Sequence, residues 1–291
     1  VTGLFCLIRK ADKALSDNEN KKNKLTEEEQ EINDRQSGSK IIRSILTVIA
    51  ILMIIGGSVY FGFYLYERYT AGTDNPYDSS TTVPTTTQEE KQVKNPIDFD
   101  TLQKGNSEIY AWIKIPGTKV DYPIVQSETD DNFYLKHSAF DKSYILSGAI
   151  FSQSANSTDF SDRVTVLYGH NSSNEKMFAS LHRFEKADFF DKYDKIYVYT
   201  PSHKLTYKIV SEFKYDNRHI LNSFDFRDDN IYKEFIDMVQ NPESTAKDVR
   251  TNLGKDITTD DRLLVLSTCI EGQSSNRLLV CGVLTKDEKT Y

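Results

Sequence analysis

The chain has 291 residues, and its 36 Lys and Arg against 43 Asp and Glu give a formal net charge of −7. This length corresponds to one or two domains, and a content of 38% apolar and 27% charged residues excludes a protein with many membrane spans. The acidic balance argues against nucleic-acid binding, which normally requires a basic face. Three cysteines cannot form a disulfide framework, so the fold must depend on an apolar core.

The first element expected along the chain is a membrane-spanning helix at 44–66, a stretch without any charged residue. At about 1.5 Å per residue it would be about 35 Å long, enough to cross a hydrocarbon core of about 30 Å. A buried core helix is rarely apolar on every face over so long a stretch, and the apolar part of a signal peptide is shorter and lies nearer the N-terminus. The sequence therefore predicts a single retained transmembrane helix.

The basic residues on either side predict the orientation of this helix. Residues 1–43 contain nine Lys or Arg, whereas after Arg68 the next basic residue is Lys91. The positive-inside rule then places 1–43 in the cytoplasm and the rest of the chain outside the cell membrane. Residues 67–94 are expected to form an extracellular tether, because they are rich in Thr, Ser and Pro and poor in large apolar side chains.

Residues 95–291 form the expected globular domain, in which short apolar runs alternate with turn signals. The expected strands are 111–115, 120–125, 164–167, 196–199, 205–210, 263–266 and 278–284, and helical patterns occur at 98–106, 175–184 and 231–239. Many short strands with few helices favour a mostly β fold that is one closed or nearly closed barrel.

The three cysteines occupy different surroundings. Cys6 lies in an apolar patch on the cytoplasmic side, and Cys281 lies within the apolar strand LLVCGVL, where cysteine acts as a small hydrophobic residue. Cys269 ends the strand LLVLST and precedes the polar sequence IEGQSSN, a position that substrates can reach. Cys269 is therefore the candidate nucleophile, although its position alone favours an unreactive thiol.

Two further residues suit chemistry at a thiol. His170 ends the strand VTVLYG, and an imidazole close to a cysteine promotes formation of the thiolate. Arg277 follows Cys269 by eight residues, and its permanent charge and fixed donors suit an oxyanion, although a surface ion pair with Glu271 is an alternative. The other histidines, which have no distinctive neighbours in sequence and are expected to be solvated, are His137, His182, His203 and His219.

The chain has no sequence pattern for a metal or a phosphate. Paired Cys/His spacings of the zinc type are absent, and the glycines are scattered rather than gathered in a phosphate-binding loop. We therefore expect no metal site and no cofactor.

Two motifs together resemble the sortase family, the cysteine transpeptidases of Gram-positive cell surfaces. LSTC at 266–269 ahead of Arg277 and YGHN at 168–171 are highly specific in combination, and the similarity extends over 95–284. The helical start of the domain and the helix at 231–239 are similar to class B sortases. The resemblance implies a closed eight-stranded sortase barrel with peripheral helices.

The resemblance also implies roles for individual residues. Cys269 would be the nucleophile, His170 the general acid and base, and Arg277 the residue that orients the substrate and stabilises the oxyanion. The family implies attack on a Thr carbonyl in a C-terminal sorting signal of a secreted protein, followed by transfer to an amine of the peptidoglycan precursor. The residues expected to contact the substrate are Ser267, Thr268 and, more weakly, Asn132. Glu271 stands where some class B members carry an acidic residue, and we interpret it as a loop residue.

Two other functions stay open at this point. A pilin-polymerising enzyme would use a Lys side chain in place of the cell-wall amine, with the same chemistry at Cys269. A non-catalytic surface module would bind peptides on the barrel without cleaving them. The residues do not select the sorting motif, the client proteins or the acceptor.

Overall fold

A computed structural model describes residues 47, 53 and 93–291. The predicted cytoplasmic segment 1–43, most of the predicted transmembrane helix 44–66 and tether 67–94, and Cys6 lie outside the described residues. Among the helices that the structure describes, none has the length and apolar character needed to cross a bilayer. The membrane topology therefore stays a prediction.

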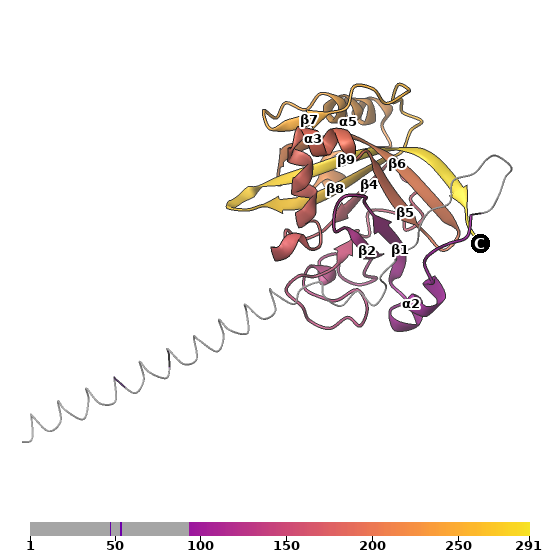
Figure 1. The fold of residues 1–291 in the computed structure, drawn as a ribbon, viewed down its shortest axis with the longest axis vertical. Helices are drawn as coiled ribbons and strands as arrows, with labels where there is room; N and C mark the ends of the chain where they lie inside the picture. Colours follow the sequence, from indigo (N-terminus) through magenta and orange to yellow (C-terminus); the bar gives the residue numbers. More distant parts are fainter. Residues whose placement is uncertain (1–46, 48–52, 54–92) are drawn as a thin grey trace, which may run out of the picture. The chain divides into compact units, whose positions relative to one another are not determined.

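The strands of residues 93–291 form a closed barrel (Figure 1). Nine strands make one sheet in the order β5-β1-β2-β3-β4-β8-β9-β6-β7, and the further pairing of β5 with β6 closes eight of them into a ring. The ninth strand, β7, pairs with β6 outside this ring. The predicted closed eight-stranded barrel is confirmed. The strands are β1 (Ile109–Lys114), β2 (Asp121–Val125), β3 (Ile150–Phe151), β4 (Val164–Tyr168), β5 (Lys195–Tyr199), β6 (His203–Asp216), β7 (Lys247–Val249), β8 (Leu263–Ile270) and β9 (Gln273–Lys289).

Short helices lie around the barrel. They are α2 (Phe99–Gly105), η1 (Phe133–Leu135), η2 (Ser173–Glu175), η3 (Ala179–Glu185), α3 (Ala187–Lys192), α4 (Ile220–Ser223) and α5 (Asp229–Gln240). The expected helix at 175–184 is instead a 3-10 helix that starts later, because Glu175 and Met177 adopt left-handed backbone angles that end any helix before η3. Strands β3 and β7 and helices α3 and α4 were not predicted, since two to six residues are too few to show a period.

Strands β8 and β9 are longer than their apolar sequences indicated. The polar residues after Cys269, which we expected to form a loop, continue the ladder on both sides of a tight turn at Glu271 and Gly272. Gly272 has φ of 72°, a left-handed angle that glycine adopts without strain. The hairpin extends beyond the apolar core, so its outer residues are polar although they are strand residues (Figure 1).

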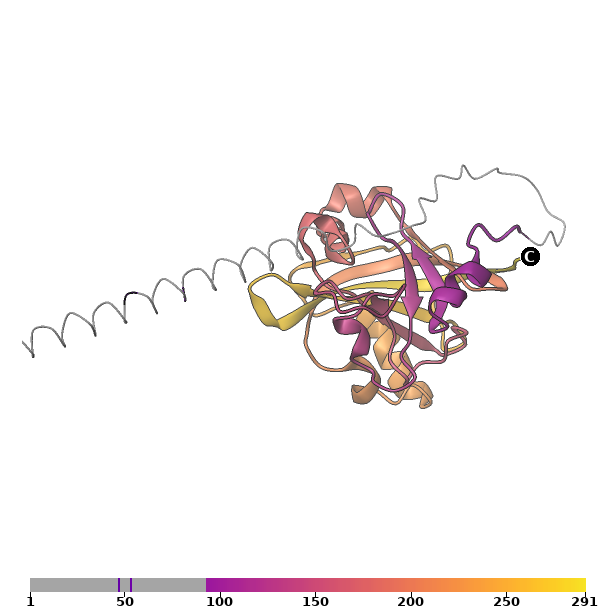
Figure 2. The same cartoon turned by 90° about the horizontal axis from the view of Figure 1, so that it is seen from below.

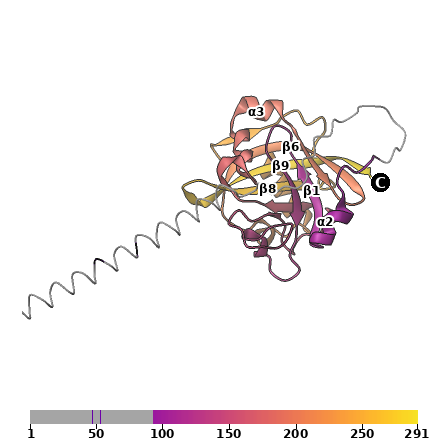
Figure 3. The same ribbon diagram turned by 60° about the horizontal axis from the view of Figure 1, so that its bottom comes forward.

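The two faces of β8 pack against different cores. Leu264 and Leu266 belong to a cluster with residues from β1, β2, β4, β5, β6 and β9, which is the interior of the barrel. Leu263 and Val265 belong to a second cluster with the apolar side of α5, on the outer face. Figure 2 shows α5 (orange) and the pair η3–α3 (salmon) on opposite sides of β8 and β9, and Figure 3 shows α3 and α2 at separate edges of the barrel.

Candidate active site

Cys269 and Arg277 are direct cross-strand neighbours in the β8–β9 hairpin. Opposite residues in an antiparallel pair project from the same face, with Cβ atoms about 4.5–5.5 Å apart. Cys269 is exposed and Arg277 is half-buried. The pairing therefore places the start of the Arg277 side chain beside that of an accessible cysteine.

His170 reaches the same edge through strand β4. Strands β4 and β8 are parallel, and their last ladder pair is Tyr168 with Ser267. The Gly169 N–H then donates to the Ser267 carbonyl at 3.2 Å. His170 lies two residues beyond Tyr168, and Cys269 lies two residues beyond Ser267. Because the carboxyl ends of parallel neighbours meet at one edge, this register brings the backbones of His170 and Cys269 to the same edge of the barrel.

The orientation of His170 is set by the segment between β2 and β3. Its Nε2 lies 2.7 Å from the carbonyl oxygen of Leu135 at the end of η1. A carbonyl only accepts, so Nε2 carries the hydrogen and Nδ1 is the nitrogen left for proton transfer. Gly148 supports this carbonyl: it has φ of 57°, and a Cβ there would lie 2.5 Å from the Leu135 oxygen.

Arg277 is bound to its own strand. Its Nη1 donates to the carbonyl oxygens of Ser274 at 3.0 Å and Asn276 at 2.8 Å. No ion pair joins Arg277 to Glu271 within residues 93–291, so the alternative of a surface pair is wrong. Glu271 is exposed in the turn, as expected for a loop residue. The guanidinium retains further donors that a substrate oxygen can use.

The three predicted substrate-contact residues occupy different positions. Ser267 is 6% exposed and lies one period before Cys269 on the same face of β8. Thr268 is 2% exposed and lies opposite Leu278 of the barrel interior, so the structure does not bring it to the face of Cys269. Asn132 is exposed at the start of η1, three residues before the carbonyl that holds His170.

Two residues contact Cys269 that sequence reasoning did not assign to the site. The Asn171 amide nitrogen lies 3.1 Å from the Cys269 carbonyl oxygen, and His182 Nε2 lies 3.0 Å from the same oxygen. The expectation of a solvated His182 is therefore wrong. The YGHN motif already contained Asn171, whereas the helical pattern at 175–184 contains His182 but does not mark it for a site.

The remaining histidines are partly exposed, and each also has a structural contact. His137 stacks on Phe133 with ring centroids 3.9 Å apart, and His203 Nδ1 lies 2.6 Å from Asp287. His219 accepts a hydrogen bond from a backbone N–H at the start of α4 through its Nδ1.

Burial separates the two described cysteines. Cys281 is fully buried between β8 and β6, and the loss of hydration raises the pKa of its thiol far above the usual range. It therefore stays a neutral thiol, as its apolar strand indicated. Near the site, burial raises the pKa of Tyr168 to about 12, so its phenol is neutral at physiological pH. Within residues 93–291, no group of three or more His, Cys, Asp or Glu side chains could hold a metal ion.

These observations define a class of protein. The strand registers carry an exposed cysteine, a histidine with one ring nitrogen at a carbonyl oxygen, and an arginine to one edge of a closed β-barrel. That set is suited to acyl transfer through a cysteine thioester.

Comparison with known proteins identifies the family. The family model "Sortase domain" matches residues 113–285. Sortase B of Listeria monocytogenes is 28% identical over 232 residues, 77% of this chain and 87% of that protein. The solved structure of sortase B from B. anthracis in complex with AAEK1 superposes with a TM-score of 0.60 at 28% identity, over 78% of this chain and 99% of that one. A class B sortase of Streptococcus pyogenes involved in pilus biogenesis has a TM-score of 0.55 at 29% identity, over 65% and 98%.

The chain therefore belongs to the sortase family, and its relatives place it in class B. It is a cysteine transpeptidase, as the sequence motifs indicated.

Proposed function

We propose that this enzyme cleaves a C-terminal sorting signal of secreted proteins and transfers them to an amine of the peptidoglycan precursor, with Cys269, His170 and Arg277 as catalytic residues. The observation that carries the proposal is the register of the barrel. Two separate ladders, β4 with β8 and β8 with β9, bring His170 and Arg277 to either side of Cys269.

The first half of the reaction forms a thioester. The Cys269 thiolate attacks the carbonyl carbon of the Thr residue, and negative charge develops on the carbonyl oxygen. The free donors of Arg277 stabilise that charge. As the C–N bond breaks, the His170 imidazolium gives its proton to the leaving amide nitrogen.

The second half returns the enzyme to its starting state. An incoming amine attacks the thioester, a new C–N bond forms and the C–S bond breaks. His170 takes the proton from the amine, since the same group must serve in reverse, and the thiolate is restored. Water is the competing nucleophile, which would give hydrolysis instead of transfer.

The location of the enzyme is a second part of the proposal. Its support is the uncharged stretch at 44–66 and the bias of basic residues toward 1–43. A single-pass anchor with the N-terminus in the cytoplasm and the catalytic domain outside would place the active site near the cell wall. The tether at 67–94 would hold the barrel away from the lipid.

Mass spectrometry of a peptide library incubated with the full chain tests the chemistry. We expect one cut site within a short motif and, when an amine is added, a product joined to that amine. The Cys269→Ala variant should fold with the same unfolding temperature and cleave nothing. Unchanged cleavage by this variant would show that another group is the nucleophile.

Pilin polymerisation is a second candidate, favoured by the similarity to the S. pyogenes class B sortase involved in pilus biogenesis. A transfer assay with glycine peptides in competition with lysine side chains separates the two acceptors. The non-catalytic binding module is disfavoured, because the chain belongs to a family of transpeptidases.

A further inference from the structure

The Cys269 carbonyl lies where one strand of the barrel ends. In the ladder between β4 and β8, the Ser267 carbonyl accepts from the Gly169 N–H at 3.2 Å. Carbonyls two residues apart on a strand point the same way, so the Cys269 carbonyl also points toward β4. Strand β4 has ended by this point and the chain turns away after His170. The Cys269 carbonyl therefore has no backbone N–H of β4 opposite it, whereas the Ser267 carbonyl has the N–H of Gly169.

Two side chains take the place of that donor. Asn171 donates its amide N–H to the Cys269 oxygen at 3.1 Å, and His182 Nε2 lies 3.0 Å from it. The Asn171 nitrogen and His182 Nε2 are themselves 3.1 Å apart. A carbonyl oxygen has two lone pairs and accepts both hydrogen bonds. We call these two residues the carbonyl clamp.

His182 is held from its other side by a carboxylate. Its Nδ1 lies 3.0 Å from Glu185 Oε1, and its side chain is 22% exposed. Each ring nitrogen has an oxygen acceptor, and Nε2 also has the Asn171 amide nitrogen at 3.1 Å. The imidazolium donates at both positions, whereas the neutral ring with its hydrogen on Nδ1 accepts from Asn171. Glu212 of β6 is close enough to Glu185 for the two carboxyl groups to interact electrostatically. In the imidazolium form, His182 adds a positive charge near the thiolate of Cys269 as well as a donor to its carbonyl.

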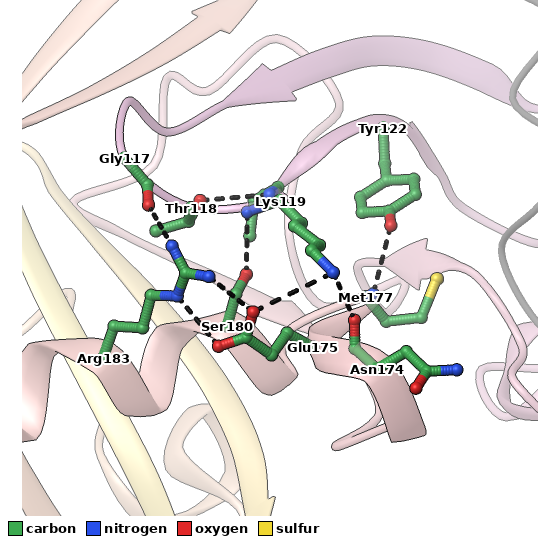
Figure 4. Close-up of polar contacts among 10 residues, drawn as sticks. Gly117, Thr118, Lys119, Tyr122, Asn174, Glu175, Met177, Ser180 and Arg183 are labelled. Atoms are coloured by element: carbon green, nitrogen blue, oxygen red, sulfur yellow. Dashed lines mark hydrogen bonds and ion pairs between the residues drawn. The ribbon is translucent and has the colours of Figure 1, made fainter.

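The segment that carries the clamp is braced against the turn between β1 and β2 (Figure 4). Arg183, next to His182, forms a bidentate ion pair with Glu175 and donates to the Gly117 carbonyl at 2.8 Å. The hydrogen bonds from Arg183 lower the pKa of Glu175, so this carboxylate is ionised at neutral pH. The pair keeps one end of η3 against the turn.

Lys119 of the same turn binds the clamp segment at two further points. Its ammonium donates to the Asn174 carbonyl at 2.8 Å, and its backbone N–H donates to Ser180 Oγ at 3.1 Å (Figure 4). Glu175 and Met177 adopt left-handed backbone angles that are costly for residues with long side chains. Such angles persist only where surrounding contacts hold them, so the brace places η3 in one position before substrate binds.

We propose that Asn171 and His182 are positioning residues that hold Cys269 through its carbonyl oxygen. They fix the peptide plane that follows Cys269 and therefore the direction of its Sγ toward His170 and the substrate. A small misplacement of a reacting atom can lower a rate by about a hundredfold. The kinetic consequence rests on the proposed transpeptidation, whereas the effect on the thiol itself does not.

The test compares variants of the full chain that differ in one donor. Asn171→Asp keeps the shape but puts an oxygen where the amide donor stood, and His182→Ala removes donor and charge. His182→Gln keeps a donor near the Nε2 position without the charge. His203→Gln is the matched control, because it removes an imidazole–carboxylate pair on the exposed side of β6 and β9.

Two rates are measured for each variant. The first is the rate of cleavage of a sorting peptide, from which kcat and KM are obtained. The second is the rate at which iodoacetamide alkylates Cys269, monitored by mass spectrometry of the peptide that contains this residue. We expect N171D and H182A to lower kcat and the alkylation rate about tenfold to a hundredfold, with KM changed less than about twofold. H182Q should recover most of the loss, and H203Q should match the wild type. The unfolding temperature of each variant shows that it is folded.

Wild-type rates in both N171D and H182A would overturn the proposal. Variants whose only change is a lower unfolding temperature, with kcat and the alkylation rate unchanged, would overturn it too. A wild-type chain that cleaves no peptide but whose alkylation still depends on the clamp would refute the proposed function and support the clamp. Normal transpeptidation, with an alkylation rate that is the same in the wild type and in the variants of Asn171 and His182, would support the proposed function and refute the clamp.

Discussion

Replacement of Glu212 by Gln tests whether the buried carboxyl group of this residue has a raised pKa. Glu212 is 2% exposed and lies opposite Val280, a residue of the barrel interior. Burial, together with the nearby charges of Glu185 and Asp248, raises the pKa of Glu212 to about 8. Gln has nearly the same shape and no charge, so the variant removes the titration and keeps the packing.

The direction of the effect follows from proton binding. An unfolded Glu titrates at roughly 4.3. Between that pH and about 8, the folded protein holds a proton that the unfolded chain has released, so the free energy of unfolding falls as the pH rises. At about 1.4 kcal/mol per pKa unit, the loss from pH 5 to pH 7.5 is about 3 kcal/mol. Above about pH 8 both states are ionised and the loss is complete.

Urea unfolding at pH 5 and at pH 7.5 measures this difference. We expect the wild type to lose about 3 kcal/mol more than Glu212→Gln over this range, and the variant to be the more stable protein at pH 7.5. Glu234→Gln, at an exposed position on α5, is the control and should behave as the wild type. An equal pH dependence in wild type and Glu212→Gln would refute the assignment of a buried neutral carboxyl.

Four further substitutions test the geometry around His170 and Arg277. Gly148→Ala adds a Cβ at 2.5 Å from the Leu135 oxygen and should lower the free energy of unfolding by about 1–3 kcal/mol and kcat as well, measured by urea unfolding and peptide cleavage. Gly169→Ala places a Cβ within 2.7 Å of the Phe178 ring and should cost about 1–3 kcal/mol, seen in the same titration. Arg277→Lys keeps the charge but not the fork of donors, so kcat should fall about tenfold, against about a hundredfold or more for Arg277→Ala.

Each of these expectations has an outcome that contradicts it. Full activity in Gly148→Ala would mean that the Leu135 carbonyl does not orient His170. Wild-type stability in Gly169→Ala would show that the β4 end can move without cost. Equal rates for the Lys and Ala variants of Arg277 would exclude a role for its forked donors.

Much of the site could be predicted because its signals are local. Alternation of apolar residues marked the strands that end near His170 and Cys269, and the two short motifs singled out these residues and Arg277. The length of β8 could not be predicted in the same way. Its last residues are polar on a solvated hairpin, and a solvated strand has no apolar alternation to distinguish it from a loop.

The sequence by itself predicted which side chains carry the proposed chemistry and that they stand on a barrel, because motif and period are properties of neighbouring residues. Only the tertiary structure decided what holds the nucleophile in place. Asn171 and His182 reach the Cys269 carbonyl across 98 and 87 residues of chain. Contacts between such distant residues depend on strand order and register, and those arise only when the whole barrel closes around its core.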